Sequence, residues 1–375
     1  MRAARLHGAR DIRIEEVPEP SLLPDGLLLR PRFTGLCGSD LHVWHAGPFG
    51  DLGPMVLGHE FSAEVVAVGD QVTDDRLRPG TLVAVEPMWT CGQCGPCRRG
   101  AYNLCRDIVW HGLSEHDGGL GELTAVRACM AHPLPDGVDA LAGALVEPLA
   151  VAHHAVGRGG LGTGGTAAVL GAGPIGIAVA LNLVARGVAL IVVSEPSLVR
   201  RTALTTALAA VGVHEPDAAL APAAAPGTAA ALGTGAGTGA GAGTTLRVVD
   251  PAAEDLPSAV AGLTEGDGVE VVFDAAGVEP AFQAGLRIVR PGGRVVTVAI
   301  YARPVAFRPL DVFFGEIDLV ASCAYQDDFP SVIDLLRAGA FPTDGWVHPV
   351  AFDTVGAAFE TLDQAQAVKL LVDLT

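Results

Sequence analysis

Residues 166–187 read TAAVLGAGPIGIAVALNLVARG, and this stretch decides the fold of a large part of the chain. The apolar residues 167–170 predict a buried strand, and residues 175–187 predict the helix that follows. Glycines in the turn between them permit a tight bend and let backbone N–H groups approach a pyrophosphate at the helix N-terminus. The turn predicts a dinucleotide site of the pattern G-x-G-x-x-G, formed by Gly171, Ala172, Gly173, Pro174, Ile175 and Gly176.

A carboxylate beyond this turn bears on which dinucleotide would bind. Glu195 stands nineteen residues after Gly176, at the end of the next predicted strand, 189–196. A carboxylate there can accept hydrogen bonds from ribose hydroxyls and would repel a 2'-phosphate, so the sequence predicts NAD rather than NADP. Arg200 could pair with a 2'-phosphate, but we expect it to lie along the adenosine ribose while Glu195 decides the preference.

The predicted secondary structure differs between the two halves of the chain. After residue 149, apolar strands such as 246–250, 269–277 and 293–300 alternate with helical stretches, which predicts a parallel sheet covered on both faces. Before residue 149, short predicted strands are separated by Gly, Pro and Asp, which is typical of a mainly β domain. A chain of 375 residues exceeds one hydrophobic core. We therefore predict an α/β protein of two domains.

One segment, 217–245, consists almost entirely of Ala, Gly, Thr and Pro. Its side chains cannot bury enough apolar area to offset the entropy lost on ordering. We therefore interpret it as a flexible surface insertion between a helix that ends near Val211 and the strand 246–250.

Four of the seven cysteines occur close together, with the spacing C-x2-C-x2-C-x7-C. Four thiolates in so short a loop can close a tetrahedron around Zn2+ with no open position, which makes such a site structural. An iron–sulfur cluster also uses four thiolates, and a redox dithiol needs only one C-x-x-C pair, but the spacing favours zinc. We expect Cys129 and Cys323 to be small buried residues. The predicted structural zinc lobe spans about 88–108 and uses Cys91, Cys94, Cys97 and Cys105.

A second set of metal-ligating side chains is dispersed over the first 150 residues. It supplies one thiolate, one imidazole and two carboxylates, which is enough for three protein ligands and an exchangeable oxygen, the arrangement of a catalytic zinc. The sequence leaves open which carboxylate would bind the metal directly. These ligands come from three motifs, which are GLCGSDLH with Cys37, Ser39, Asp40 and His42, GHE with His59 and Glu60, and LVEPLA with Glu147.

The net charge and the distribution of apolar residues bear on which binding partners the protein can have. The formal net charge is -18 and no Lys/Arg cluster is dense, so nucleic acid and anionic membranes would be repelled. No apolar run approaches the ~20 residues of a membrane helix, and the first twenty residues contain charges and no apolar h-region. We expect a cytoplasmic enzyme that acts on a small molecule and binds neither nucleic acid nor membrane.

Together these motifs resemble the zinc-containing medium-chain dehydrogenase/reductase family over nearly the whole chain apart from 217–245. The resemblance implies a GroES-like β-barrel catalytic domain from 1–148 and 324–375, and a Rossmann domain with a doubly wound parallel sheet from 149–323. It also implies NAD, one catalytic and one structural zinc per chain, and a homo-dimer or homo-tetramer. The resemblance rests on GLCGSDLH (35–42), GHEFSAEVVAVG (58–69), the four-cysteine lobe, GALVEPLAVAHHAV (143–156) and GAGPIG (171–176).

The resemblance also assigns roles to the dispersed set. It implies that Cys37 and His59 bind the catalytic zinc, and that two carboxylates reach the metal directly or through its water. It makes the hydroxyl and imidazole of GLCGSDLH candidates for a proton relay. The carboxylates are Glu60 and Glu147, and the relay candidates are Ser39 and His42.

Within the family, segments such as 144–156 and 325–336 are most similar to 2,3-butanediol (acetoin) dehydrogenases. Polyol (sorbitol or xylitol) dehydrogenases usually have a tyrosine where Val43 stands and an arginine where Ala324 stands. L-threonine dehydrogenases differ around the later zinc carboxylate. A non-catalytic NAD-binding protein is the alternative from another class. Candidates for the pocket wall are Trp44, Trp110 and Tyr325.

Overall fold

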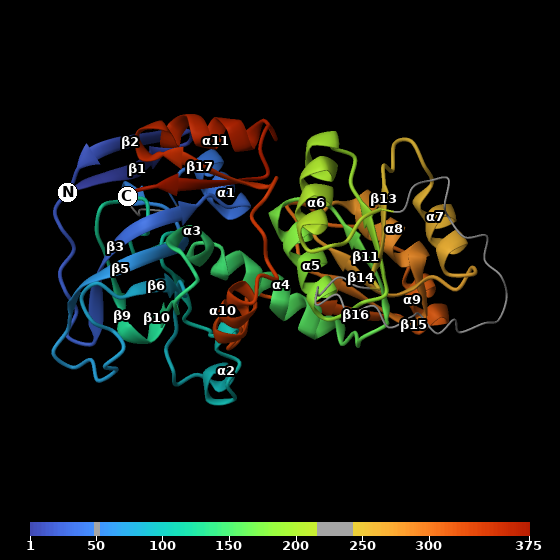
Figure 1. The fold of residues 1–375 in the computed structure, drawn as a ribbon, viewed down its shortest axis with the longest axis horizontal. Helices are drawn as coiled ribbons and strands as arrows, with labels where there is room; N and C mark the ends of the chain where they lie inside the picture. The colour runs from blue at the N-terminus through green and yellow to red at the C-terminus, as the bar shows by residue number, and fades with distance from the viewer. Residues whose placement is uncertain (49–52, 216–242) are drawn as a thin grey trace. The chain divides into compact units, whose positions relative to one another are not determined.

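The computed structural model describes residues 1–48, 53–215 and 243–375, which form two compact units (Figure 1). The first unit contains Met1–His154, Cys323–Gly339 and Trp346–Thr375, and the second contains Ala155–Ser322 and Ala340–Gly345. Most of the predicted insertion, 217–242, lies outside the described residues. In the described part of the chain, every helix is too short or too polar to cross a membrane.

The first unit is built mainly of antiparallel sheet, as its turn-rich sequence predicts. Its largest sheet has seven strands in the order β10-β6-β5-β3-β18-β17, with β9 also paired to β3. These strands are β3 (Gly26–Gly35), β5 (Glu60–Val68), β6 (Leu82–Val85), β9 (Thr124–Arg127), β10 (Ala131–Pro133), β17 (Val347–Ala351) and β18 (Lys369–Asp373). Smaller sheets are formed by β1 (Arg2–Gly8), β2 (Asp11–Glu16) and β4 (Met55–Val56), and by β7 (Met88–Trp89) and β8 (Val109–Trp110).

Helices of the first unit are short apart from one. The helix α4 (Val146–Gly159) begins in this unit, and its start contains Glu147. The others are α1 (Gly38–Ala46), α2 (Gly95–Arg98), α3 (Ala140–Gly143), α10 (Phe329–Arg337) and α11 (Val355–Asp363), with 3-10 helices η1 (Tyr102–Leu104), η2 (Ala128–Met130) and η3 (Phe352–Thr354).

Strand β3 joins the two ends of the chain within this unit. Its C-terminal half pairs antiparallel with β5 on one side, where Glu60 lies opposite Gly35. On the other side it pairs antiparallel with β18, where Val372 lies opposite Thr34. Alternate β3 side chains pack into a buried apolar cluster that includes Leu27 and Leu29, and burial of that kind contributes about 25 cal/mol per Å². Residues that are hundreds of positions apart therefore meet at the end of β3.

The second unit contains the predicted parallel sheet. Its six strands follow the order β13-β12-β11-β14-β15-β16, and every pairing is parallel. The chain order reverses between β11 and β14, and open sheets of this kind bind ligands beyond the carboxyl ends of the strands at that point. The strands are β11 (Thr166–Leu170), β12 (Leu190–Ser194), β13 (Thr245–Val249), β14 (Val269–Asp274), β15 (Val289–Thr297) and β16 (Asp318–Ala321).

Helices connect these strands and account for the continuous apolar runs in the sequence. All five residues of β12 are buried, as expected for a strand covered on both faces. The helices are α5 (Pro174–Ala185), α6 (Leu198–Ala210), α7 (Leu256–Leu263), α8 (Glu279–Ile288) and α9 (Pro309–Gly315).

Candidate functional site

Three residues of the dispersed set meet at the end of β3. The ligand atoms of Cys37, His59 and Glu60 all lie within 4.8 Å of one another. Cys37 is the N-cap of α1, while His59 directly precedes β5 and Glu60 begins it. A thiolate, an imidazole and a carboxylate at this separation suit one Zn2+, whose bonds to such ligands are about 2.0–2.3 Å long. The three side chains form a candidate metal centre, and three protein ligands would leave one position of a tetrahedral zinc for a further ligand.

His59 is held from both sides of its ring. Its Nδ1 atom lies 3.3 Å from Oδ1 of Asp40, and its Nε2 atom lies 3.3 Å from the Ser39 hydroxyl. Asp40 is buried and its other oxygen accepts the backbone N–H of Cys37 at 2.9 Å, which fixes the carboxylate. A carboxylate on one ring nitrogen typically orients a metal-binding histidine. From the sequence, Asp40 is one residue of GLCGSDLH with no role of its own; in the structure it caps α1 and lies against His59.

The electrostatics of this cluster favour a cation. Burial opposes a charged imidazole, but the charge of Asp40 and then that of Cys37 outweigh it, so the pKa of His59 lies well above its ordinary value. The same acidic surroundings that stabilise a proton on His59 would stabilise a metal ion in its place.

Glu60 already has a cationic partner. Its carboxylate forms an ion pair with Lys369, the only lysine of the sequence, and both side chains are 1% exposed. The Lys369 ammonium also donates to the Leu36 carbonyl at 3.0 Å. Burial opposes its charge, yet Glu60 raises the pKa of Lys369. A metal ion and Lys369 would therefore compete for the Glu60 carboxylate. Sequence reasoning missed Lys369, and its solitary occurrence was the available signal.

Glu147 lies near this cluster, outside the group of three whose ligand atoms gather. It is buried near the start of α4. Burial raises the pKa of Glu147 to about 7, the charge of His59 opposes the rise, and Glu60 adds to it. The two predicted carboxylates thus differ, because Glu60 is paired with an ammonium and Glu147 is desolvated. Of the relay candidates, Ser39 contacts His59, whereas His42 is exposed on α1.

The four clustered cysteines converge as a second candidate metal centre. The Sγ atoms of Cys94 and Cys97 are 3.4 Å apart, those of Cys91 and Cys105 3.5 Å, and the pairs 94–105 and 91–97 are 3.9 and 4.0 Å apart. A tetrahedron of thiolates with Zn–S bonds of about 2.3 Å has edges of about 3.8 Å, so these positions fit one zinc ion. Backbone N–H groups, that of Cys97 first, lower the pKa of Cys94 to about 6.

Two further cysteines and three aromatic residues lie outside both candidate metal centres. Cys129 and Cys323 are exposed, so the expectation that they are small buried residues is wrong. Among the candidates for the pocket wall, Trp44 packs in an apolar cluster against Phe359, while Tyr325 is buried near Glu147. Trp110 is half-buried in β8.

In the second unit, the glycine turn has the backbone that its sequence predicts. Gly171 directly follows β11 and has φ = +94°, a conformation that side chains rarely allow. A Cβ atom at Gly176 would lie 2.0 Å from the Gly171 carbonyl oxygen. Gly173 is the N-cap of α5, and Pro174 and Ile175 begin that helix. Gly171 and Gly176 are therefore both required for the close approach of strand and helix at this point.

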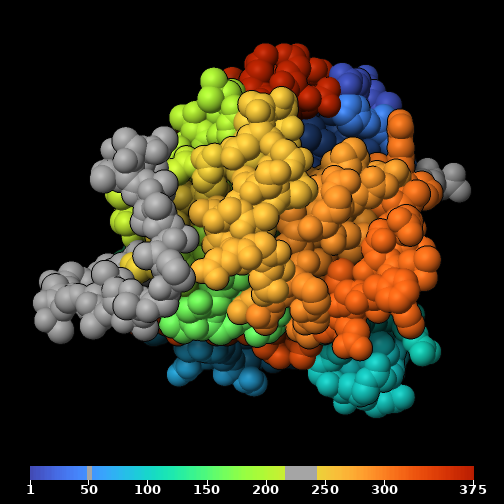
Figure 2. All heavy atoms as spheres, turned by 90° about the vertical axis from the view of Figure 1, so that its right-hand side faces the viewer, coloured from blue at the N-terminus to red at the C-terminus, as the bar shows by residue number. Residues whose placement is uncertain are grey.

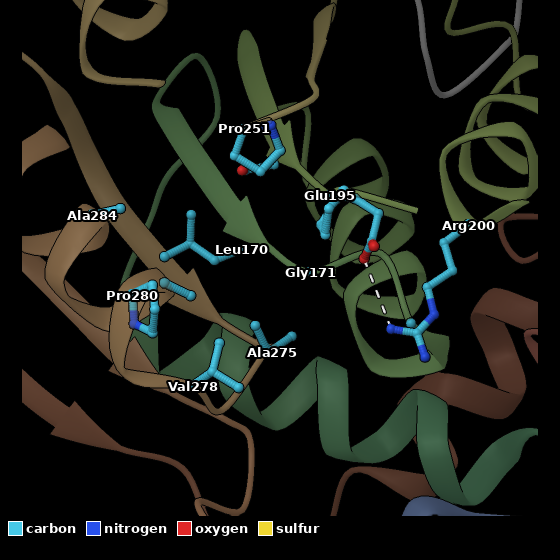
Figure 3. Close-up of a pocket in the computed structure, with 14 residues that line it drawn as sticks. Leu170, Gly171, Glu195, Arg200, Pro251, Ala275, Val278, Pro280 and Ala284 are labelled. Carbon is cyan, nitrogen blue, oxygen red and sulfur yellow. Dashed lines mark ion pairs between the residues drawn. The ribbon is translucent and has the colours of Figure 1, made fainter. Parts of the chain in front are cut away.

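Beside the turn lies a cavity of about 370 Å³, which Figure 3 shows with its lining residues. Its walls include Leu170, Gly171, Gly173, Glu195 and Arg200. The Glu195 carboxylate is fixed because its two oxygens accept the backbone N–H groups of Ala172 and Ser197, each at 2.8 Å. Arg200 lies 4.0 Å from the same carboxylate. The apolar walls and the fixed carboxylate suit an adenosine group.

Known families match both parts of the chain. Residues 23–136 match the alcohol dehydrogenase GroES-like domain, and residues 240–338 match the zinc-binding dehydrogenase family. The (R,R)-butanediol dehydrogenase of Neisseria gonorrhoeae (strain ATCC 700825 / FA 1090) is 30% identical, with 100% of this chain and 99% of that protein covered. The sorbitol dehydrogenase of Bacillus subtilis (strain 168) is 31% identical, with 92% and 88% covered. The chain belongs to the zinc-containing medium-chain dehydrogenase/reductase family, as predicted.

Solved structures agree with this assignment. The crystal structure of 2R,3R-butanediol dehydrogenase from Bacillus subtilis has a TM-score of 0.83 and 31% identity, covering 100% of this chain and 99% of that one. A structure from Sinorhizobium meliloti 1021, described as a zinc-binding dehydrogenase bound to NADP, has a TM-score of 0.83 and 29% identity, covering 99% and 98%. The predicted combination of a GroES-like domain and a Rossmann sheet is confirmed.

Proposed function

We propose that this chain is a zinc-dependent, NAD-linked dehydrogenase that interconverts a small secondary alcohol and its ketone, with 2,3-butanediol and acetoin as the substrate pair. The observation that supports it most is the meeting of Cys37, His59 and Glu60 beside the buried Glu147, in a chain that also contains a dinucleotide pocket. In the other direction the enzyme would reduce acetoin to 2,3-butanediol, and by the same chemistry it would reduce diacetyl to acetoin.

Each residue of the cluster has a proposed part. Cys37 and His59 would hold the metal together with Glu60 or Glu147, and Asp40 keeps the His59 ring oriented. When bound, zinc supplies Lewis acidity, which makes the proton of an alcohol easier to remove. Ser39, whose hydroxyl lies beside His59, is placed to receive such a proton and pass it on. His42, exposed on α1, would release it to solvent.

In the nucleotide pocket, the backbone of residues 171–176 would bind the pyrophosphate at the start of α5. Glu195 would accept hydrogen bonds from the adenosine ribose and disfavour a 2'-phosphate, with Arg200 alongside. The bound nicotinamide supplies the capacity to accept a hydride from the substrate carbon. We therefore propose NAD as the cofactor. The likeness to a structure bound to NADP makes the opposite preference the alternative to test.

The choice of butanediol rests on the similarity to proteins of that name and on Ala324, a methyl group where polyol dehydrogenases usually have a cation. Likeness to a sorbitol dehydrogenase favours polyol oxidation as the second candidate. Zinc-loaded protein should be assayed for formation of reduced cofactor with the butanediol stereoisomers, sorbitol, xylitol and L-threonine, with NAD and with NADP. We expect the highest kcat/KM for one butanediol stereoisomer with NAD. Preference for sorbitol or xylitol would overturn the substrate assignment, and cofactor binding without any turnover would favour a non-catalytic protein.

The second unit has features of a self-association surface. Its edge strand β16 pairs only with β15 among the described strands, and nearby α9 has Phe313 and Phe314 at 71% and 79% exposure. Figure 2 shows this side of the chain, with the orange residues around 300–320 at the surface. Unpaired edges and large exposed apolar side chains mark association sites. We propose that a second copy of the chain covers this face, giving a homo-dimer or a homo-tetramer.

A further inference from the structure

Residues 323–328, which precede α10 in the first unit, have an unusual backbone. Ala324 has φ = +50° and Asp327 has φ = +58°, so two residues other than glycine adopt left-handed conformations within four positions. This region is disfavoured for alanine, and such strain persists only where the surroundings fix it. Strained backbone of this kind is concentrated at functional sites.

The four-cysteine lobe supplies part of what fixes the segment. The Asn103 side chain donates to the Cys323 carbonyl at 2.8 Å, and the Asp327 N–H donates to the Tyr102 hydroxyl at 2.7 Å. Both lobe residues belong to η1, and the metal-ligating candidate Cys105 is the C-cap of this helix. The lobe therefore contacts the segment at both of its ends.

A second anchor comes from α4. The Asp328 carboxylate accepts the N–H of Gln326 at 2.8 Å and contacts Nδ1 of His153 at 2.6 Å and Nδ1 of His154 at 3.1 Å. Because α4 also contains Glu147 near its start, one helix supports both the segment and a candidate metal ligand.

Between these anchors the segment presents Tyr325. The side chain is completely buried and its ring packs against Phe329 at 5.1 Å. Its hydroxyl lies near enough to Glu147 to interact with the carboxylate, but the contact falls outside hydrogen-bond geometry. A buried hydroxyl that is poorly hydrogen-bonded and lies beside a candidate metal ligand is suited to an oxygen of a bound molecule.

We propose that Tyr102 and Asn103 are positioning residues for the active site, which hold residues 323–328 so that the Tyr325 hydroxyl lies beside Glu147 and meets an oxygen of the substrate. The inference rests on the proposed function, because it takes the surroundings of Glu147 as the substrate side. If Tyr102 and Asn103 act in this way, the cysteine lobe contributes to substrate binding as well as to the stability of its own loop.

The test compares the double variant Tyr102→Phe/Asn103→Ala with Leu104→Ala, whose side chain in the same 3-10 helix is 52% exposed. Hydrogen exchange of peptide 323–330 should accelerate in the double variant and stay unchanged in the control. The KM for butanediol should rise about tenfold to a hundredfold, since misplacement by 1 Å can have effects of that size. The KM for NAD and the zinc content should remain those of the unmodified protein. Tyr102→Phe alone serves if the double variant fails to fold.

Adding Ala324→Gly to the double variant provides a rescue, because glycine adopts the left-handed conformation without a steric penalty. We expect most of the KM change to be reversed. Faster exchange with an unchanged KM for butanediol would show a structural role alone and overturn the proposal, as would unchanged exchange. If the unmodified protein oxidises no alcohol, the proposed function fails in the substrate assay, and the exchange rates still decide whether η1 holds the segment.

Discussion

The Lys369 ammonium forms a buried ion pair with the Glu60 carboxylate, although 309 positions separate the two residues in the sequence. Removing one partner of such a pair leaves an uncompensated buried charge, which destabilises a protein by about 3–5 kcal/mol. We therefore expect Lys369→Met to lower the free energy of unfolding of the zinc-free protein by about that amount, as measured by urea denaturation.

Zinc should change this result. A metal ion at the cluster of Cys37 and His59 could take the place of the ammonium beside Glu60, so adding zinc should restore most of the stability of the Lys369→Met variant. The matched control is Arg337→Met, which removes a surface pair with Asp334 and should cost less than about 1 kcal/mol. A loss in Lys369→Met no larger than in the control would contradict the prediction.

Cys37→Ser should abolish alcohol oxidation and remove one of two zinc ions per chain, because serine is a poor substitute for a thiolate ligand. Zinc content and turnover, measured on the same preparation, check this. Cys129→Ser is the control, since Cys129 is an exposed cysteine outside both candidate metal centres. Normal turnover with a full zinc content in Cys37→Ser would refute the proposed catalytic metal centre.

Glu195→Gln should weaken the preference for NAD. The substitution removes the charge that would repel a 2'-phosphate and keeps an oxygen that can accept the Ala172 N–H. We expect the ratio of kcat/KM with NADP to kcat/KM with NAD to rise at least about tenfold, which corresponds to about 1.4 kcal/mol. Glu270→Gln, in the same unit but outside the pocket, should leave the ratio unchanged. No change in Glu195→Gln would mean that another group sets the preference.

His111 should make the protein sensitive to acid. Burial, and then the charge of His116, lower the pKa of His111 to about 3, while an unfolded histidine titrates near 6.5. The unfolded chain binds the extra proton between these values, so stability falls as pH decreases below about 6.5, by about 2 kcal/mol at pH 5. His111→Gln should remove this dependence in urea denaturation at several pH values, and exposed His348→Gln should retain it. An unaltered pH slope in His111→Gln would exclude His111 as the cause.

The exposed phenylalanines of α9 give a test of self-association. Phe313→Asp/Phe314→Asp places charge on the proposed contact face, so we expect the molar mass measured by light scattering to fall to that of a smaller assembly or a single chain. Leu263→Asp, also exposed but on α7, is the control and should leave the mass unchanged. If both variants keep the mass of the unmodified protein, a different surface mediates assembly.

Local patterns were sufficient to predict much of this molecule. The strands and glycine turn around Gly171 follow from apolar runs and from glycine's conformational range, both of which depend on neighbours in sequence. The spacing of the cysteines between Cys91 and Cys105 likewise brings them together within one short loop. These predictions needed no knowledge of how distant segments pack.

Long-range relationships could not be predicted in the same way. No local pattern shows that Lys369 reaches Glu60, because that contact depends on β18 pairing with β3. The exposure of Cys129 and Cys323 depends on which face each segment turns to solvent, and their short flanking sequences give no clear period. The arrangement of Tyr325 beside Glu147 depends on the anchors that hold residues 323–328.

Because the single lysine, Lys369, is buried, the protein surface carries no lysine ammonium. Every cationic side chain that meets solvent, apart from histidine, is a guanidinium, which keeps its proton throughout the usable range of alkaline buffers. The pattern of positive charge on the exterior should consequently stay constant where a lysine-rich protein would lose it. Acylating reagents and lysine-directed enzymes would find no side-chain amine on the folded protein, so their reaction with Lys369 would report unfolding.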